Sequence, residues 1–582
     1  MAFNIVASSF EQKYIERSQL RMTGMTGFIF GFVALYFNFV GLITQFMERW
    51  IIEGVLTLAH FTIMGVALFA GITIAIRSKD LSVPGKIING AVVGAIVGIA
   101  LGLLMLFMTQ LNVRYMFVAL SHKLFQFLSW KQGVGGGILL QIVLSAGLGA
   151  LGAGIVVMPK ALRRPLIWGL SAVFIAGLFS ELIQLVMQYE FILGFRDWFF
   201  TWEGQRLQGA IVVFVVTFAA MLFWTIRGGA VKERFGKMSP SGQKSVRYFG
   251  WACALILFLL FPAAAGSFFG QVMMYVGLFI LMGMGLNLEL GLAGLLDLGF
   301  VAFFAAGAYT IALFTGEHEL QILLLDRPLT WWEALPLAVL VSVAIGFMFG
   351  IPVLKVRGDY LAVATMGLGE IIRVVVLSDM AAPLLGGSQG MLHIPRPFLF
   401  GWELNDPIYL FYLTLVCATV AGYFAWALEN SRLGRAWMAI REDEDVGQAL
   451  GINLVNVKLL AYGLGAAFAG LAGAIFAVML TSIFPHSFQL LISINILALL
   501  IVGGLGSLPG VVVGAAMLIG TPELLREFGE YRFLAYGAVL IAMMRIKPIG
   551  LWPSAARKRE IQSAEEIEAS IREQMEEEGG RT

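Results

Sequence analysis

Three polar side chains interrupt one apolar stretch of the sequence, GLNLELGLAGLLDLG at residues 285–299. These polar residues are Asn287, Glu289 and Asp297. The same stretch holds four glycines, Gly285, Gly291, Gly294 and Gly299. In a membrane, charged groups are costly and usually face protein or water, and a broken helix survives only where it is buried or lines a cavity. The pattern favours a discontinuous helix beside a translocation path over an interfacial loop with hydrated acids.

A second charged pair lies in RGDYLAVATMGLGEIIR at residues 357–373. Glu370 and Arg373 are three residues apart, which places them on one helix face within reach of each other. We expect them to neutralise each other inside a helix bundle, in preference to contacting a transported molecule directly. The segment GGSQGM at 386–391 supplies flexible backbone, but no Lys-Ser or Lys-Thr follows it. The chain has no GxxxxGK[ST] phosphate-binding loop, so any nucleotide hydrolysis belongs to another subunit.

A third candidate is the polar segment SRLGRAWMAIREDEDVGQALGINLVNVK at 431–458. It predicts a short amphipathic helix whose end is capped by Gly451. Such a helix can lie flat on the membrane or dock on a partner protein. Its acidic cluster would be repelled by an anionic lipid surface, so docking on a partner is favoured. Its polar face includes Arg435, Arg441, Glu442 and Asp443.

The composition identifies the class of protein that must position these residues. Of 582 residues, 59% are hydrophobic and 13% are charged, whereas ordinary soluble domains carry roughly 25% charged residues. A soluble enzyme is therefore excluded. Glycine, at 68 residues, is abundant enough to let helices approach closely in lipid. We expect an all-α polytopic membrane protein.

Charge and cysteine content exclude other classes of site. The net charge of +2 implies no nucleic-acid partner. Cys253 and Cys417 both lie in apolar stretches, which leaves no disulfide framework and no pair with metal-ligand spacing. No cofactor is expected, and no His, Cys and Asp constellation favours an intramembrane enzyme.

Apolar windows of about 20 residues, the length that crosses a bilayer, predict about 16 transmembrane helices in two groups. The first group has about six windows: 27–46, 53–76, 87–109, 136–158, 166–188 and 207–226. The second has about ten: 248–266, 268–287, 299–316, 333–354, 358–378, 407–428, 458–480, 488–506, 511–524 and 533–546.

The placement of Lys and Arg predicts the orientation of these helices. The polar link 227–247 carries six basic residues, and cytoplasmic loops are enriched in such residues. We therefore expect this link and both termini to be cytoplasmic. The link also divides the chain into an N-terminal extension, 1–247, and a second domain, 248–553. The charged tail 554–582 predicts a cytoplasmic helix, solvated in preference to a partner-binding coiled coil.

Five segments of the second half resemble, in the same order, the LivM-type permeases of branched-chain amino-acid ABC importers. The resemblance covers roughly residues 250–553, and the first 247 residues match nothing in that family. One departure is Val511 after Gly510, where relatives often carry Pro. The segments are GLAGLLDLGFVAFFAAGAY (291–309), RGDYLAVATMGLGEIIR (357–373), GGSQG (386–390), GLGAAFAGLAG (463–473) and GGLGSLPGVVVGA (503–515).

This resemblance implies a bacterial inner-membrane location and a set of partners. They are a second permease of the same superfamily, two cytoplasmic ABC ATPases and an extracytoplasmic substrate-binding protein. It also implies that 434–452 matches the loop that couples permease to ATPase, with Gly451 at the characteristic glycine. The expected function is ATP-driven import of a branched-chain or other hydrophobic amino acid. The alternatives are import of urea or short amides, and a membrane scaffold that transports nothing.

Overall fold

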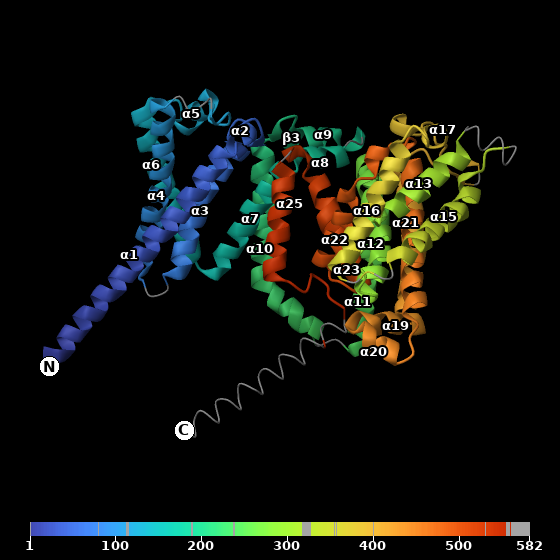
Figure 1. Cartoon of the computed structure of the whole chain (residues 1–582). Coiled ribbons are helices and arrows are strands. Elements are labelled where there is room, and N and C mark those ends of the chain that lie inside the picture. The colour runs from blue at the N-terminus through green and yellow to red at the C-terminus, as the bar shows by residue number, and fades with distance from the viewer. Residues whose placement is uncertain are drawn as a thin grey trace, which may run out of the picture. The chain divides into compact units, whose positions relative to one another are not determined.

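The computed structural model (Figure 1) describes most of the chain. The described residues are 2–78, 81–111, 116–187, 190–236, 239–316, 327–353, 356, 358–399, 401–529, 531–554 and 559. The chain divides into two compact units, Met1–Leu255 and Ile256–Thr582, and each is described by itself.

The first unit is built from long helices that pack through glycines. A Cβ atom on Gly94 of α4 would meet the backbone of Ser145 on α6, and one on Gly149 of α6 would meet the backbone of Gly90. This close approach is the role of small residues in membrane helices. The long helices are α1 (Ala2–Phe39), α3 (Leu58–Arg77), α4 (Val83–Gln110), α6 (Gly133–Val157), α7 (Lys160–Leu178) and α10 (Leu207–Gly236).

Short elements connect these helices. Four short strands within the described part form one small sheet in the order β2-β1-β4-β3. The strands are β1 (Trp50–Ile52), β2 (Leu56–Thr57), β3 (Phe200–Thr201) and β4 (Gly204–Gln205). The short helices are α2 (Leu42–Phe46), α5 (His122–Leu128), α8 (Ser180–Val186) and α9 (Glu190–Phe199).

The second unit surrounds α21 (Leu454–Leu480), whose side chains are largely buried. Helix α21 packs on α12, α13 and α15, and α12 packs on α18. The other long helices are α12 (Ser267–Leu286), α13 (Val301–Thr315), α15 (Trp331–Val353), α16 (Asp359–Leu377), α18 (Pro407–Glu429), α22 (Leu490–Gly503) and α25 (Tyr531–Ile546). Residues 256–265 of α11 (Pro240–Ala265) also belong to this unit, whereas the earlier residues of that helix belong to the first.

Shorter elements complete this unit and make its turns. Two are π-helices, η2 (Asn287–Leu292) and η5 (Ala516–Gly520), and two form the polar loop, α19 (Arg432–Glu442) and α20 (Glu444–Ala449). The remainder are α17 (Ala382–Leu385), η3 (Gly387–Gln389), β5 (Phe398–Leu399), β6 (Trp402–Glu403), η4 (Pro485–Ser487), α23 (Leu508–Ala515), α24 (Thr521–Leu524) and η6 (Arg526–Phe528).

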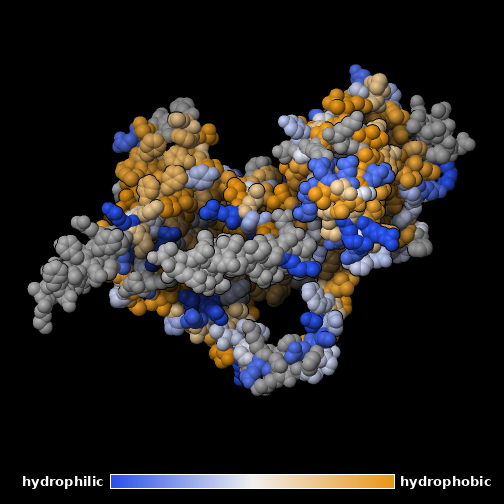
Figure 2. All heavy atoms as spheres, turned by 60° about the horizontal axis from the view of Figure 1, so that its bottom comes forward, coloured by the Kyte–Doolittle hydropathy of each residue, from blue (hydrophilic) through white to orange (hydrophobic). Residues whose placement is uncertain are grey.

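The prediction of an all-α polytopic membrane protein is confirmed. Within the described residues, 13 helices are long and apolar enough to cross a membrane. The other three of the sixteen predicted windows correspond to shorter helical segments. These are Val301–Thr315 and Leu508–Leu524, and Tyr531–Ile546. Apolar side chains cover much of the surface seen in Figure 2, as expected for helices that face lipid.

The polar link 227–247 is more helical than a flexible boundary would be. Residues up to Gly236 continue α10, and α11 begins at Pro240. The division between the compact units falls farther along, inside α11 at Leu255 and Ile256. The predicted helical tail, 554–582, lies outside the described residues except for Ser554 and Arg559.

The predicted orientation can be tested at two exposed serines. Ser239 precedes α11, and Ser388 lies in η3. In a background lacking Cys253 and Cys417, Ser388→Cys should react with a membrane-impermeant thiol reagent in intact cells. Ser239→Cys should react only after the cells are opened, because its link is rich in basic residues and is predicted to be cytoplasmic. The reverse labelling pattern would overturn the orientation.

Candidate functional site

The predicted break in the helix is present at residues 287–300. Helix α12 widens into the π-helix η2, and the chain then runs without regular structure to α13. The left-handed turn at Gly294, with φ of +75°, ends the helical path. Single-turn π-helices are often found at functional sites. The break therefore has the backbone geometry that the glycine-rich sequence predicts.

The polar residues of this break are buried, so the alternative of a hydrated interfacial loop is wrong. Asn287 is 1% exposed, Glu289 0% and Asp297 1%. Among the described residues, no N–H or hydroxyl group is hydrogen-bonded to either carboxyl oxygen of Glu289 or to Oδ2 of Asp297, and the two carboxyl groups interact with each other. Asp297 uses its Oδ1 to accept the backbone N–H of Gly299 at 2.6 Å. Burying carboxyl groups is costly, which makes this cluster a candidate functional site.

Helices α16 and α21 enclose the acidic cluster. Thr365 of α16 accepts the backbone N–H of Leu298 at 3.0 Å. Gly465 of α21 lies so close to Glu289 that a Cβ atom there would collide with the carboxyl group. Gly465 is 11 residues beyond the start of α21, about 16 Å along the helix axis at 1.5 Å per residue. Glu289 therefore lies well inside the span.

The broken helix is tied to a second glycine-rich turn at residues 504–506. The side-chain Oδ1 of Asn287 accepts the backbone N–H of Gly506 at 2.9 Å. Gly506 adopts a φ of +73°, and a Cβ atom on it would lie 3.2 Å from the carbonyl oxygen of Gly291. The chain after α25 joins the same turn, because the N–H of Trp552 donates to the carbonyl of Gly503 at 2.8 Å.

The polar loop between α18 and α21 reaches the broken helix through Arg441. Its Nη1 donates to the carbonyl oxygen of Gly291 at 2.5 Å. A Cβ atom on Gly294 would lie 3.0 Å from Cγ of Arg441, so glycine makes room for this side chain. Arg441, assigned from sequence to the polar docking face, is instead directed toward the break.

The other residues of this loop divide into internal anchors and exposed groups. Asp443 caps α20 by accepting the backbone N–H groups of Asp445 at 2.9 Å and Val446 at 3.0 Å. Glu442 is exposed. Arg435 donates to the carbonyl of Asn430 at 3.3 Å on the exposed side. Glu442, Asp443 and Arg435 are thus the exposed members of the predicted set, and Asp443 in addition caps α20.

Gly451 ends α20 as the sequence predicts. Its φ is +89°, and its N–H donates to the carbonyl of Gln448 at 3.0 Å. The next N–H, of Ile452, donates to Gly447 at 3.1 Å. These two bonds make a Schellman cap. A Cβ atom on Gly451 would meet nothing within 4 Å, so the positive φ alone favours glycine.

Two anchors of the loop were not predicted from the sequence. The fully buried Trp437 donates its ring N–H to the carbonyl of Val457 at 2.8 Å. Lys458 forms an ion pair with Glu444 at 2.6 Å, and its side chain is 6% exposed. The sequence feature that could have predicted this ion pair is a lysine at the start of an apolar span, 14 residues after an acidic residue. These contacts hold α19 and α20 against the base of α21.

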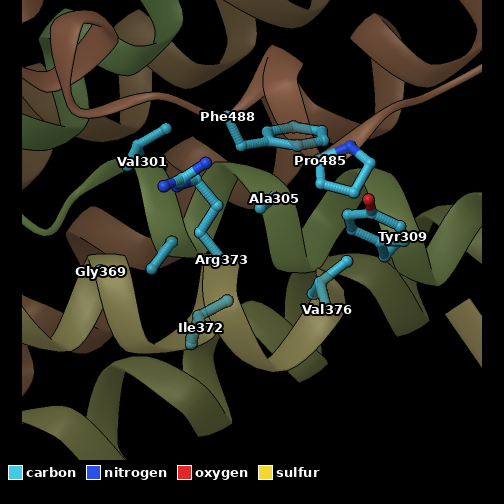
Figure 3. A pocket seen from close by; sticks show the side chains of 10 residues that line it. Val301, Ala305, Tyr309, Gly369, Ile372, Arg373, Val376, Pro485 and Phe488 are labelled. Carbon is cyan, nitrogen blue, oxygen red and sulfur yellow. The ribbon is translucent and has the colours of Figure 1, made fainter. Parts of the chain in front are cut away.

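Glu370 and Arg373 form the ion pair that their spacing predicts, but the pair is not enclosed in a bundle as expected, since the two side chains are 48% and 27% exposed. Nε and Nη2 of Arg373 both donate to Oε1 of Glu370, the first at 2.9 Å. Glu370 lies five residues from Thr365, about 140° around the helix at 100° per residue. It therefore occupies a different face of α16 from the acidic cluster. Figure 3 shows Arg373 in a crevice that also contains Tyr309 and Phe488.

Comparison with known proteins decides the family. Residues 268–546 match the family described as branched-chain amino acid transport system / permease component. LivM, the high-affinity branched-chain amino acid transport system permease protein of Salmonella typhimurium, is 34% identical over 389 residues, which cover 59% of this chain and 88% of LivM. The chain belongs to the LivM-type permease family.

Further relatives extend this family assignment. LivM of Escherichia coli K12 is 38% identical over 299 residues, covering 47% of this permease and 68% of the relative. LivH of Salmonella typhimurium is 31% identical over 127 residues, which cover 21% of this permease and 41% of LivH. No solved structure matches the chain. The matched family segment contains the broken helix, the ion pair and the polar loop.

Close packing at Gly465 gives a test of the acidic cluster. We expect Gly465→Ala to lower the unfolding temperature of the purified protein, because overpacking a core costs about 1–3 kcal/mol. The matched control is Gly537→Ala in α25, where a Cβ atom would meet nothing within 4 Å. The control should be neutral or slightly stabilising, since Ala is the better helix former. Equal unfolding temperatures for the two variants would contradict the packing of Glu289 against α21.

Proposed function

We propose that this permease is the membrane subunit of an ATP-driven importer for branched-chain or other hydrophobic amino acids. The observation that carries the proposal is the bond from Arg441 to the carbonyl of Gly291. It connects an exposed polar loop directly to a broken helix inside the membrane. A movement of the loop would therefore reach the helix break without passing through flexible chain.

The proposed partners follow from what this chain lacks and from its relatives. The sequence has no phosphate-binding loop, so two separate cytoplasmic ATPase subunits supply the energy. LivM and LivH relatives are both permease proteins of high-affinity branched-chain amino acid transport systems, which supports pairing with a second permease subunit. An extracytoplasmic binding protein delivers the amino acid.

In this proposal, the residues at the break line or control the translocation path. They are Asn287, Glu289, Gly291, Gly294 and Asp297, with Glu370 farther along α16. Arg435, Glu442, Asp443 and Gly451 belong to the ATPase-coupling loop. Asp443 and Gly451 act there by shaping α20, because their hydrogen bonds stay within the loop. Glu442 and Arg435 provide the contacting charges.

The cargo is tested by uptake into vesicles that contain the complete complex. ATP is supplied on the side of the membrane that carries the ATPase subunits, and leucine-loaded binding protein on the opposite side. Labelled leucine should then accumulate on the ATPase side. Labelled urea and acetamide, each with the binding protein that accompanies this system, should not accumulate. Accumulation of either amide in place of leucine would replace the proposed cargo. No uptake together with no stimulated ATP hydrolysis would favour a scaffold.

Charge reversal at Glu442 tests the docking surface. Glu442→Lys should reduce the amount of ATPase that copurifies with the permease several-fold, because repulsion replaces attraction at an exposed site. The control is Glu403→Lys in the opposite, outward loop that contains β5 and β6, which should retain the ATPase fully. Unchanged retention in Glu442→Lys would move the docking surface elsewhere.

A second variant separates docking from transmission in the same experiment. Arg441→Gln should retain the ATPase, since Arg441 is directed toward the broken helix and away from the docking face. Leucine uptake per ATP hydrolysed should nevertheless fall, because the loop loses its charged contact with Gly291. Loss of ATPase retention in this variant would place Arg441 in the docking surface.

A further inference from the structure

Two carboxyl groups meet at the broken helix inside the membrane. Glu289 and Asp297 are both buried, and their side chains are within hydrogen-bonding reach of each other. Two ionised carboxylates this close together repel each other, and an apolar surrounding offers neither of them solvation. Paired carboxyl groups in proteins avoid this cost by sharing one proton. The neutral acid of such a pair donates a hydrogen bond to the remaining carboxylate.

The basic side chains near this pair of acids are bound to other groups. Arg441 of α19 donates to the carbonyl of Gly291, and Lys458 of α21 pairs with Glu444 at 2.6 Å. The ion pair of α16 is satisfied within that helix. Helices α12 and α18 also pack on η2, but α12 contains no charged residue and α18 contains only its last residue. Within the described residues, the two acids therefore have no cation bound to them.

A third polar group approaches the two acids from α21. Tyr462 is 2% exposed, and its hydroxyl has no hydrogen-bond partner among the described residues. This hydroxyl is close enough for Asp297 and Glu289 both to act on it electrostatically. It belongs to the same face of α21 as Gly465, which lies three residues later against Glu289. A buried hydroxyl without a partner is costly, so this O–H is available to a carboxylate.

The backbone distinguishes the two acids from each other. Asp297 accepts the N–H of Gly299 through Oδ1 at 2.6 Å, and α13 begins shortly afterwards at Val301. A bond from an N–H group and the positive end of a helix dipole both favour the ionised form of a carboxyl group. Glu289 accepts no N–H or hydroxyl group among the described residues. A shared proton therefore belongs on Glu289.

We propose that Glu289 and Asp297 form a proton-binding site that holds one proton inside the membrane. Neutral Glu289 donates its O–H to Oδ2 of Asp297, and the hydroxyl of Tyr462 donates to the same carboxylate. Arg441, bound to the carbonyl of Gly291, supplies one positive charge to the broken helix. With one proton the acids and Arg441 sum to zero charge, whereas without it they carry a net negative charge. A second proton would remove the acceptor that the first one uses.

The proton links the conformation of the broken helix to pH. If the break opens to water, Glu289 becomes hydrated and ionises at neutral pH as an ordinary glutamic acid does, and its proton passes to water. The closed break thus binds one more proton than an open one, so acidic pH favours the closed form and alkaline pH the open form. Movement of the polar loop in a transport cycle would bind and release this proton. That last step rests on the proposed importer function, whereas the proton site itself does not.

Infrared spectroscopy of the purified full-length permease tests the proton directly, because a protonated carboxyl group has a C=O band distinct from that of a carboxylate. The unaltered permease should show this band at neutral pH, and the band should shift in D₂O. Glu289→Gln should remove the contribution of one carboxyl group. The control is Glu48→Gln, which removes an exposed acid paired with Lys123 in the first unit and should leave the band unchanged. Absence of the band from the unaltered permease, or an unchanged band in Glu289→Gln, would overturn the proton site.

The unfolding temperature gives a second measurement on the same samples. The folded permease holds a proton that the hydrated acids of the unfolded chain release, so its unfolding temperature should fall from mildly acidic to mildly alkaline pH. The fall should be smaller in Glu289→Gln, which is neutral at every pH, and unchanged in Glu48→Gln. Equal falls in Glu289→Gln and the unaltered permease would overturn the proposal. So would stabilisation by Na⁺ at constant ionic strength without a protonated band, which would identify a metal cation. Failure of the importer function would appear separately, as no leucine uptake by the unaltered complex.

Discussion

The absence of hydrogen-bond partners in hydrocarbon is the constraint on which this permease depends. A helix broken inside the membrane leaves backbone groups that lipid cannot satisfy. Here the side chain of Asn287 binds the N–H of Gly506, and Arg441 binds the carbonyl of Gly291. The break therefore exists only where three distant segments meet. The broken helix therefore depends on the residues around Arg441 and Gly506 as much as on the sequence of residues 287–299.

The same constraint explains which features of the fold were predictable from the sequence. Apolar windows located the spans closely: 268–287 was predicted for α12, which is Ser267–Leu286, and 407–428 for α18, which is Pro407–Glu429. Lipid requires about 20 apolar residues of every simple span, so the signal is local. The three shorter helices carry less of this signal, and the window at 511–524 was the weakest.

Long-range pairings were beyond the sequence, because periodicity says which face a residue occupies and not which helix covers it. The ion pair of Glu370 and Arg373 was predictable, since the two residues share one helix face. The bond of Arg441 to Gly291 spans 150 residues of sequence, and no local pattern contains it. Arg441 therefore looked like a docking group, although its neighbour Glu442 is the exposed one.

Close packing connects the polar loop to the broken helix. Trp437 and Lys458 fix α19 and α20 to the base of α21, so these contacts restrain the movement of the two helices relative to α21. Gly294 and Gly506 bring backbone close to Arg441, which leaves little slack between the loop and η2. A displacement at α19 must then either break the bond to Gly291 or move the helix break with it. Because the acidic residues Glu289 and Asp297 lie on that break, a small movement of the polar loop would also displace these buried carboxyl groups.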